Sequence, residues 1–169
     1  MMRSGRKILL TSLFLVATWV SFASISNATD SAPHFGPWLF TDQIRTGDNP
    51  RSFVLLTRTD IYDDRSPFLQ IICTVGRGYS IALFVKAKAK VPEIGIAIDN
   101  KQNLQWRGEM ENVGQFGILS APISAADVSS LTNAQKELVA TSPGLGQSFV
   151  FNVSETAKAF RVLKAACDD

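Results

Sequence analysis

From residue 38 onward, apolar and polar residues alternate over short stretches, and clusters of Gly, Pro, Asn and Asp separate these stretches. Such alternation is typical of β-strands with one buried face, because successive side chains of a strand point to opposite sides of the sheet. The pattern predicts strands at 38–44, 52–58, 68–75, 79–86, 93–99, 104–108, 115–120 and 147–153. The pair 68–75 and 79–86 is the clearest hairpin, because only a Gly-Arg-Gly turn separates the two strands.

Two segments have the periodicity of a helix instead. Residues 122–134 carry Val128, Leu131 and Ala134 along one side. The C-terminal segment has a longer apolar stripe, with steps of four, three, three and four residues. This stripe consists of Val153, Ala157, Phe160, Leu163 and Cys167. We expect the stripe to face the protein.

Polar residues flank the predicted C-terminal helix. Asn152 or Ser154 can cap its N-terminus, and Glu155 lies in its first turn, where a carboxylate suits the helix dipole. Lys164 lies near its end. The range 136–142 either continues the preceding helix or begins a strand, and propensity alone does not decide between the two.

The N-terminus has the pattern of a secretory signal peptide. Arg3, Arg6 and Lys7 precede an apolar stretch of about 15 residues that is followed by small residues. We place the cleavage after Ala28, with Ala23 as the alternative. A bilayer-spanning helix needs about 20 apolar residues, so no stable membrane insertion is expected after cleavage.

Cleavage changes the charge of the chain. Three of the 17 basic residues and none of the 15 acidic ones lie in the signal peptide, which leaves 14 basic against 15 acidic residues. No basic cluster is present in the remainder. We therefore expect no nucleic-acid partner and no attraction to anionic membranes.

About 140 residues remain after cleavage, enough for one domain but not for two. We assign 1–28 to the signal peptide, 29–36 to a flexible lead-in and 37–169 to a single β-rich domain. The predicted fold is α+β: a mostly antiparallel β-sheet or sandwich of about 7–9 strands, with one inner helix and a C-terminal helix packed on the sheet.

The two cysteines, Cys73 and Cys167, predict a disulfide. Cys73 lies on the apolar face of a predicted strand, and Cys167 lies on the inward stripe of the last helix. The bond would pin that helix across the sheet and close a loop of about 95 residues, which the chain-entropy model values at up to about 4–5 kcal/mol. A zinc site fits less well, because two thiolates and a single distant histidine do not complete a tetrahedron.

Candidate catalytic groups are sparse. The single histidine, His34, lies in the lead-in, and both thiols are expected to be oxidised, which disfavours Ser-His and Cys-His chemistry. Paired carboxylates remain as candidates for acid–base work or calcium binding, but ordinary solvation explains them and no EF-hand spacing is present. These carboxylates are Asp60, Asp63, Asp64, Glu109 and Glu111. We expect no catalytic, cofactor-binding or metal-binding residue, and no cofactor.

Four residues are candidates for a binding surface. The aromatic side chains of Trp38, Tyr79 and Trp106 can anchor an interface if they are exposed, and Arg107 adjoins the last of them. The alternative is that the aromatic residues pack in the core, which is the more common place for such side chains.

Several features follow one another in a characteristic order. They are Trp38 with Asp42, the strand Leu69-Gln70-Ile71-Ile72-Cys73, an aromatic-led strand at Tyr79, Ile98-Asp99, Trp106, a helix, Leu138-Val139 with Pro143, Phe151, and a final helix ending Leu163-Lys164-Ala165-Ala166-Cys167. In this order they resemble the VasI/TagO group of periplasmic proteins associated with type VI secretion, over essentially the whole mature chain. That group favours Gly-Leu at the entry to the last helix, where this chain has Ser154-Glu155. The resemblance implies a strand at Leu138 and no catalytic residue.

These observations predict a non-enzymatic periplasmic or secreted envelope protein that binds another envelope protein. The resemblance adds the expectation that it is an accessory of type VI secretion. The alternative is a periplasmic inhibitor of a cell-wall hydrolase, of the lysozyme-inhibitor type, because small disulfide-bonded β domains suit that work. A minimal enzyme that uses carboxylates or a bound metal is the third hypothesis.

Overall fold

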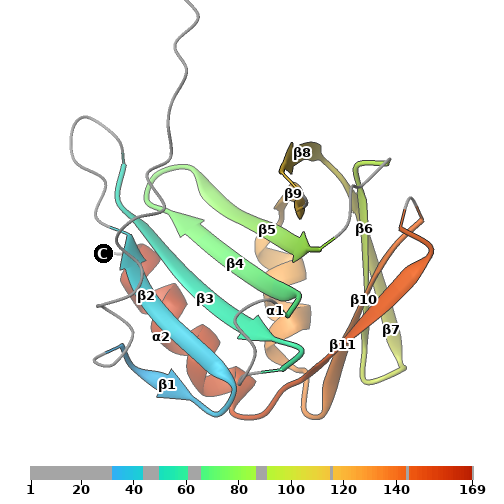
Figure 1. Ribbon diagram of the computed structural model, residues 1–169. Helices are drawn as coiled ribbons and strands as arrows, with labels where there is room; N and C mark the ends of the chain where they lie inside the picture. Colours follow the sequence, from blue (N-terminus) through green and yellow to red (C-terminus); the bar gives the residue numbers. More distant parts are fainter. Residues whose placement is uncertain are drawn as a thin grey trace, which may run out of the picture. The chain divides into compact units, whose positions relative to one another are not determined.

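In the part of the chain that the structure describes, two antiparallel sheets and two helices make up the fold (Figure 1). The computed structural model describes residues 32–43, 50–60, 66–86, 91–114, 116–143 and 145–168. The predicted signal peptide and its cleavage site at Ala28 lie outside the described residues. No helix within the described part of the chain is long and apolar enough to cross a membrane.

The larger sheet has seven strands. Their spatial order is β1 (His34–Phe35), β2 (Trp38–Gln43), β3 (Ser52–Arg58), β4 (Phe68–Thr74), β5 (Gly78–Val85), β9 (Phe116–Ile123) and β8 (Glu109–Val113). The smaller sheet has four strands, in the order β11 (Gln147–Asn152), β10 (Glu137–Ser142), β6 (Glu93–Ile98) and β7 (Gln102–Arg107). The helices are α1 (Ala125–Thr132) and α2 (Thr156–Asp168).

The register of the larger sheet aligns apolar residues on its inner face. Leu55 pairs with Ile71, Ile71 with Ile81, and Ile81 with Ala121 across four neighbouring strands. All four side chains are buried. Removing this apolar surface from water is the main force that holds the sheet against α2, which contacts β2, β3 and β4.

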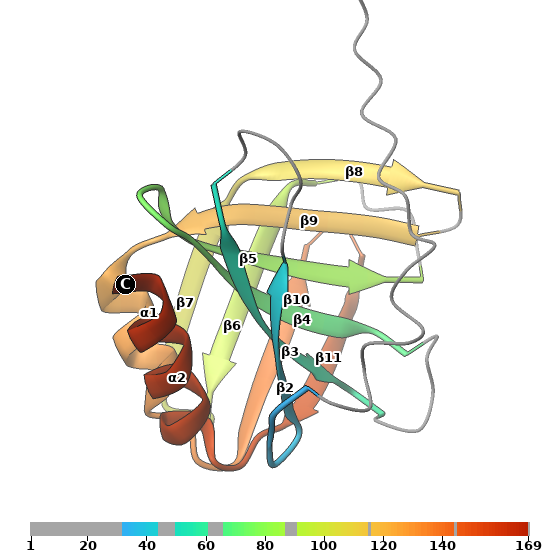
Figure 2. The ribbon, with the colours of Figure 1, turned by 90° about the vertical axis from the view of Figure 1, so that its left-hand side faces the viewer.

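The chain passes from one sheet to the other at Gly108. This residue follows β7, the edge of the smaller sheet, and precedes β8, the edge of the larger one, and its N–H donates to the carbonyl oxygen of Pro92 at 2.9 Å. A Cβ atom at Gly108 would overlap the carbonyl oxygen of Ser120. Glycine is therefore required where the strands of the smaller sheet run steeply across β5 and β9 (Figure 2).

The inner helix begins later than its sequence suggests. Pro122 and Ile123 belong to β9, where they pair with Ser80 and Tyr79, so the predicted start at residue 122 is wrong. The helix starts only after Ser124, which forms a capping box.

The C-terminal helix is confirmed, but its inward stripe differs from the predicted one. Glu155 has a left-handed φ of 52° and lies before the helix, so the helical phase begins at Thr156. Thr156, Ala159, Phe160 and Leu163 are buried. Ala157, which we predicted to face the protein, is exposed because it lies one residue off this face.

The range that sequence left undecided is a strand. β10 pairs with β6 and β11 in the smaller sheet. The strand that the family resemblance implied at Leu138 is therefore present. The carboxylate of Asp99, which lies at a turn after β6, holds the chain at the start of β10. It accepts hydrogen bonds from the N–H groups of Gln135, Lys136 and Glu137 at 2.9, 2.9 and 3.0 Å. These bonds, with that of Glu137 the largest cause, lower the pKa of Asp99.

Replacing Asp99 with alanine is expected to lower the free energy of unfolding by about 1–3 kcal/mol at pH 7, because three charge-assisted bonds are lost. Since folding lowers this pKa, its stabilisation is present above the unfolded pKa, about 3.9, and disappears as the pH falls through the folded value. Urea denaturation at pH 7 and at pH 2 measures both effects, with the exposed Glu111→Ala as a control that changes stability by less than about 0.5 kcal/mol. Equal stability of Asp99→Ala and the unaltered protein at pH 7 would contradict this account.

The α+β class is confirmed, although the eleven strands formed by the described residues exceed the predicted number. Two strands were not expected. β8 lies in a segment without clear alternation, and β1 lies in the predicted lead-in. The prediction of a flexible lead-in is therefore wrong for His34 and Phe35, which pair with Leu39 and Trp38.

Candidate functional site

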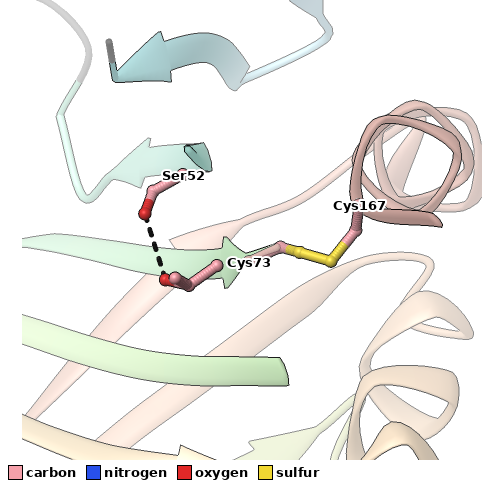
Figure 3. Close-up of a disulfide and its surroundings, with 4 residues drawn as sticks. Ser52, Cys73 and Cys167 are labelled. Carbon is pink, nitrogen blue, oxygen red and sulfur yellow. Dashed lines mark hydrogen bonds between the residues drawn. A yellow bond between two sulfur atoms is a disulfide. The ribbon is translucent and has the colours of Figure 1, made fainter. Parts of the chain in front are cut away.

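A disulfide joins the middle of the larger sheet to the last helix (Figure 3). Cys73 on β4 and Cys167 on α2 form this bond, with their Cα atoms 6.0 Å apart. Cys73 is fully buried. Beside it, the hydroxyls of Ser52 and Thr74 share a hydrogen bond of 3.0 Å between β3 and β4. The predicted disulfide is thus present, and it leaves no free thiol in the chain.

Trp38 is not part of a binding surface. Its side chain is fully buried, its ring meets Phe160 edge to face with centroids 5.5 Å apart, and its indole N–H donates to Thr156 Oγ1 at 3.3 Å. Trp38 therefore fastens α2 onto β2. The alternative of core packing therefore holds for Trp38, because the inner face of β2 needs a large apolar side chain beneath the helix.

Tyr79 is half-buried at the start of β5, on the inner face next to Cys73. Burial first, and then the charge of Asp168, raise the pKa of its phenol. Tyr79 also lines a hollow of about 360 Å³, together with Arg77 from the preceding turn and Glu109 from β8. The walls of the hollow are mixed, with both polar and apolar residues, and Tyr79 is the one aromatic residue that lines it in the described part of the chain, so it offers no aromatic stacking surface.

Trp106 connects the smaller sheet to α1. Its indole N–H donates to Asp127 Oδ2 at 3.1 Å, and the same carboxylate accepts the backbone N–H of Ser124 at 2.9 Å. Burial opposes ionisation, but the bonds from Ser124 and Trp106 outweigh it and lower the pKa of Asp127. The sequence signal for this arrangement is Ser124-x-x-Asp127, a capping-box spacing.

Arg107 is exposed over 76% of its side chain, and its Nε lies 3.9 Å from Glu93 Oε1. Such a surface ion pair contributes little to stability. Arg107 lies on β7, whereas Tyr79 lies on β5 in the other sheet. The four predicted residues are therefore spread over both sheets, and a binding role for Tyr79, Trp106 and Arg107 stays a prediction.

An exposed apolar surface lies elsewhere, on the hairpin formed by β8 and β9. Met110, Val113 and Phe116 are 37%, 42% and 38% exposed, and the remaining exposed large hydrophobic side chain among the described residues is Val150, on β11. Val113 pairs with Phe116 next to Gly114, whose φ is 62°. The signal that sequence analysis missed is a glycine turn between two apolar residues, which marks a hairpin tip.

The carboxylates considered for catalysis do not form a site in the described residues. Asp63 and Asp64 lie outside the described part of the chain. Glu109 and Glu111 lie on an exposed strand. No group of three or more His, Cys, Asp or Glu side chains that could hold a metal ion occurs among the residues that the structure describes.

The geometry defines a class of protein: a two-sheet antiparallel β domain whose C-terminal helix is disulfide-bonded to the larger sheet. No protein-family model matches the chain, and no curated protein matches it by sequence. The crystal structure of invasion associated protein B from Bartonella henselae is similar, with a TM-score of 0.59 and 14% sequence identity, over 80% of this chain and 95% of that one. At this identity the similarity shows the fold alone.

Proposed function

We propose that this chain is an exported, non-enzymatic protein that binds another protein of the cell envelope through its β8–β9 hairpin. The observation that carries the proposal is the exposure of Val113 and its cross-strand partner Phe116 side by side at the tip of the hairpin, with Met110 exposed on the other side of the same strand pair. Monomeric proteins rarely leave contiguous apolar side chains in water unless a partner covers them. A hydrophobic contact framed by polar residues is the usual centre of a protein interface.

The place of the hairpin in the sheet supports this role. Pairing between β5 and β9 ends at Val85 and Gly117, so Phe116 and its partner Val113 lie beyond the last pair of that ladder. The strands β8 and β9 run together along one margin of the unit (Figure 2). A partner can therefore reach the hairpin without displacing an element of the fold.

Two features support export. The N-terminal sequence has the basic, apolar and small-residue order of a signal peptide. The Cys73–Cys167 disulfide is typical of proteins in an oxidising compartment such as the periplasm or the cell exterior. The order of sequence features shared with the VasI/TagO group supports the narrower proposal of a type VI secretion accessory.

Cross-linked capture from the envelope tests the proposal. Val113→Ser with Phe116→Ser is expected to reduce capture of the partner at least tenfold, because truncating central apolar contacts costs about 2 kcal/mol or more. Val150→Ser, an equally exposed residue on β11, is the matched control and should leave capture unchanged. Equal loss in both variants, or none in either, would refute binding through the hairpin.

A second candidate is inhibition of a cell-wall hydrolase. The apolar hairpin tip at Val113 and Phe116 favours it, because a narrow projecting hairpin fits an enzyme cleft. Excess protein should then suppress lysozyme activity, and the Val113→Ser, Phe116→Ser variant should not. Normal lysozyme activity in the presence of excess protein would exclude inhibition of lysozyme and would not affect the proposal of binding to an envelope protein.

A further inference from the structure

The two helices form a groove on the surface of the domain. α1 and α2 contact each other and lie side by side (Figure 2). A hollow of about 560 Å³ lies between their exposed sides, and we call it the interhelical groove. Its walls include Ser129, Thr132 and Asn133 on the side of α1, and Arg161, Lys164 and Ala165 on the side of α2. None of these residues belongs to the β8–β9 hairpin.

The α2 wall of the interhelical groove is positively charged. Arg161 and Lys164 are exposed and lie three residues apart on the helix, which places their Cβ atoms about 5–6 Å from each other on one side of α2. Among the described residues neither cation has an ion-pair partner. No Asp or Glu of the described chain lines the groove either. A carboxylate is therefore the group that complements this wall, because guanidinium and ammonium groups form their strongest hydrogen bonds with anions.

The α1 wall offers hydrogen-bond acceptors. The hydroxyl of Ser129 donates to the carbonyl oxygen of Ala125 at 2.9 Å. The hydroxyl of Thr132 donates to the carbonyl oxygen of Val128 at 2.7 Å. Because their hydrogens are used within the helix, both hydroxyl oxygens can only accept further hydrogen bonds. A ligand that complements both walls therefore carries carboxylates for α2 and N–H donors for α1.

We infer that the interhelical groove binds an extended, acidic peptide segment of another protein, with Asp or Glu at alternate positions and small residues between them. Side chains at alternate positions of an extended chain point the same way and lie about 6–7 Å apart, close to the spacing of Arg161 and Lys164. The backbone of such a segment has free N–H groups, whereas a helical segment uses its N–H groups internally. This site goes beyond the proposed function, because it uses a different surface of the domain.

Two other anionic partners complement the groove less well. A lipid phosphate diester or a sulfate ion has acceptor oxygens but no N–H or O–H donor, so it leaves the hydroxyl oxygens of Ser129 and Thr132 without a partner. An anionic membrane surface gains about 1 kcal/mol for each nearby cation. Two cations beside a hollow therefore attract a membrane only weakly.

Fluorescence anisotropy with the exported, oxidised protein at low salt tests the inference. The probes are the labelled synthetic peptides acetyl-(Glu-Ala)4-amide and acetyl-(Gln-Ala)4-amide. The Glu-Ala peptide should bind the unaltered protein about tenfold or more tightly than the Gln-Ala peptide does. Arg161→Glu with Lys164→Glu should weaken binding of the Glu-Ala peptide by about tenfold or more. Added salt should weaken it as well.

Two further variants separate binding in the groove from general charge attraction. Arg77→Glu with Lys86→Glu makes the same change in net charge at exposed positions beside the two ends of β5, and should alter the affinity for the Glu-Ala peptide by less than about threefold. Ala165→Trp fills the groove at an exposed position without changing the charge, and should weaken binding by about tenfold or more. Circular dichroism confirms that each variant is folded.

The inference is overturned if the Arg161→Glu, Lys164→Glu variant retains binding, if the Gln-Ala peptide binds equally well, or if the Glu-Ala peptide does not bind at about 1 mM. Binding to vesicles that contain phosphatidylglycerol, without binding to the peptide, would identify a membrane as the occupant and overturn it. A dimer in analytical ultracentrifugation that the same variant dissociates would identify a second copy of this chain and overturn it too.

Discussion

Replacing both Cys73 and Cys167 with alanine is expected to lower the free energy of unfolding by about 3–5 kcal/mol. The disulfide closes a loop between residues 94 positions apart, and a loop of this length restricts the unfolded chain strongly. The substitution also removes a fully buried sulfur at Cys73 and leaves space under α2. Denaturant unfolding monitored by circular dichroism measures the loss.

Reduction provides the control for this substitution. Dithiothreitol should lower the free energy of unfolding of the unaltered protein by most of the amount that the alanine substitution removes. It should not change the free energy of unfolding of the alanine variant. A difference below about 1 kcal/mol between oxidised and alanine-substituted protein, or free thiols in exported material, would contradict a stabilising disulfide.

Replacing Trp38 with alanine should cost about 3–5 kcal/mol of unfolding free energy, because a fully buried indole leaves a large cavity. Phe160 would lose its edge-to-face partner, and the Thr156 hydroxyl would lose its hydrogen bond. Thermal unfolding should shift accordingly, toward lower temperature.

Trp38→Phe separates packing from the hydrogen bond. A phenylalanine keeps an aromatic contact with Phe160 and should cost less, about 1–2 kcal/mol. If Trp38→Ala instead left stability unchanged and reduced partner binding, Trp38 would be an interface residue and its buried position in the fold would be wrong.

Alternation predicted most of the larger sheet, because buried strands leave a period-two pattern that does not depend on distant contacts. The strands around Ile71 and Ile81 are examples, and their pairing is the predicted hairpin. The disulfide was predictable for a similar reason. Cys73 and Cys167 each lay on an apolar face, and two inward-facing cysteines in one small domain have few other partners.

The binding surface was not predictable in the same way. The sequence pattern does not distinguish Trp38 from Trp106. In the fold, Trp38 is buried under α2, whereas the indole N–H of Trp106 donates a hydrogen bond to Asp127. Likewise, β8 has no buried face, since all five of its residues are exposed, so it leaves no alternation to detect. Which face of α2 points inward depended on the left-handed conformation of Glu155, which delays the start of the helix to Thr156. A glutamate in the sequence does not predict that conformation.

The separation of the two cysteines also sets an order of events during biosynthesis. Cys73 leaves the ribosome 94 residues before its partner, which at about 5–20 residues per second corresponds to about 5–20 s. Throughout that interval the Cys73 thiol has no native partner. The disulfide can therefore close only after the last helix has been made, and a chain that stops before Cys167 would keep a free thiol at Cys73.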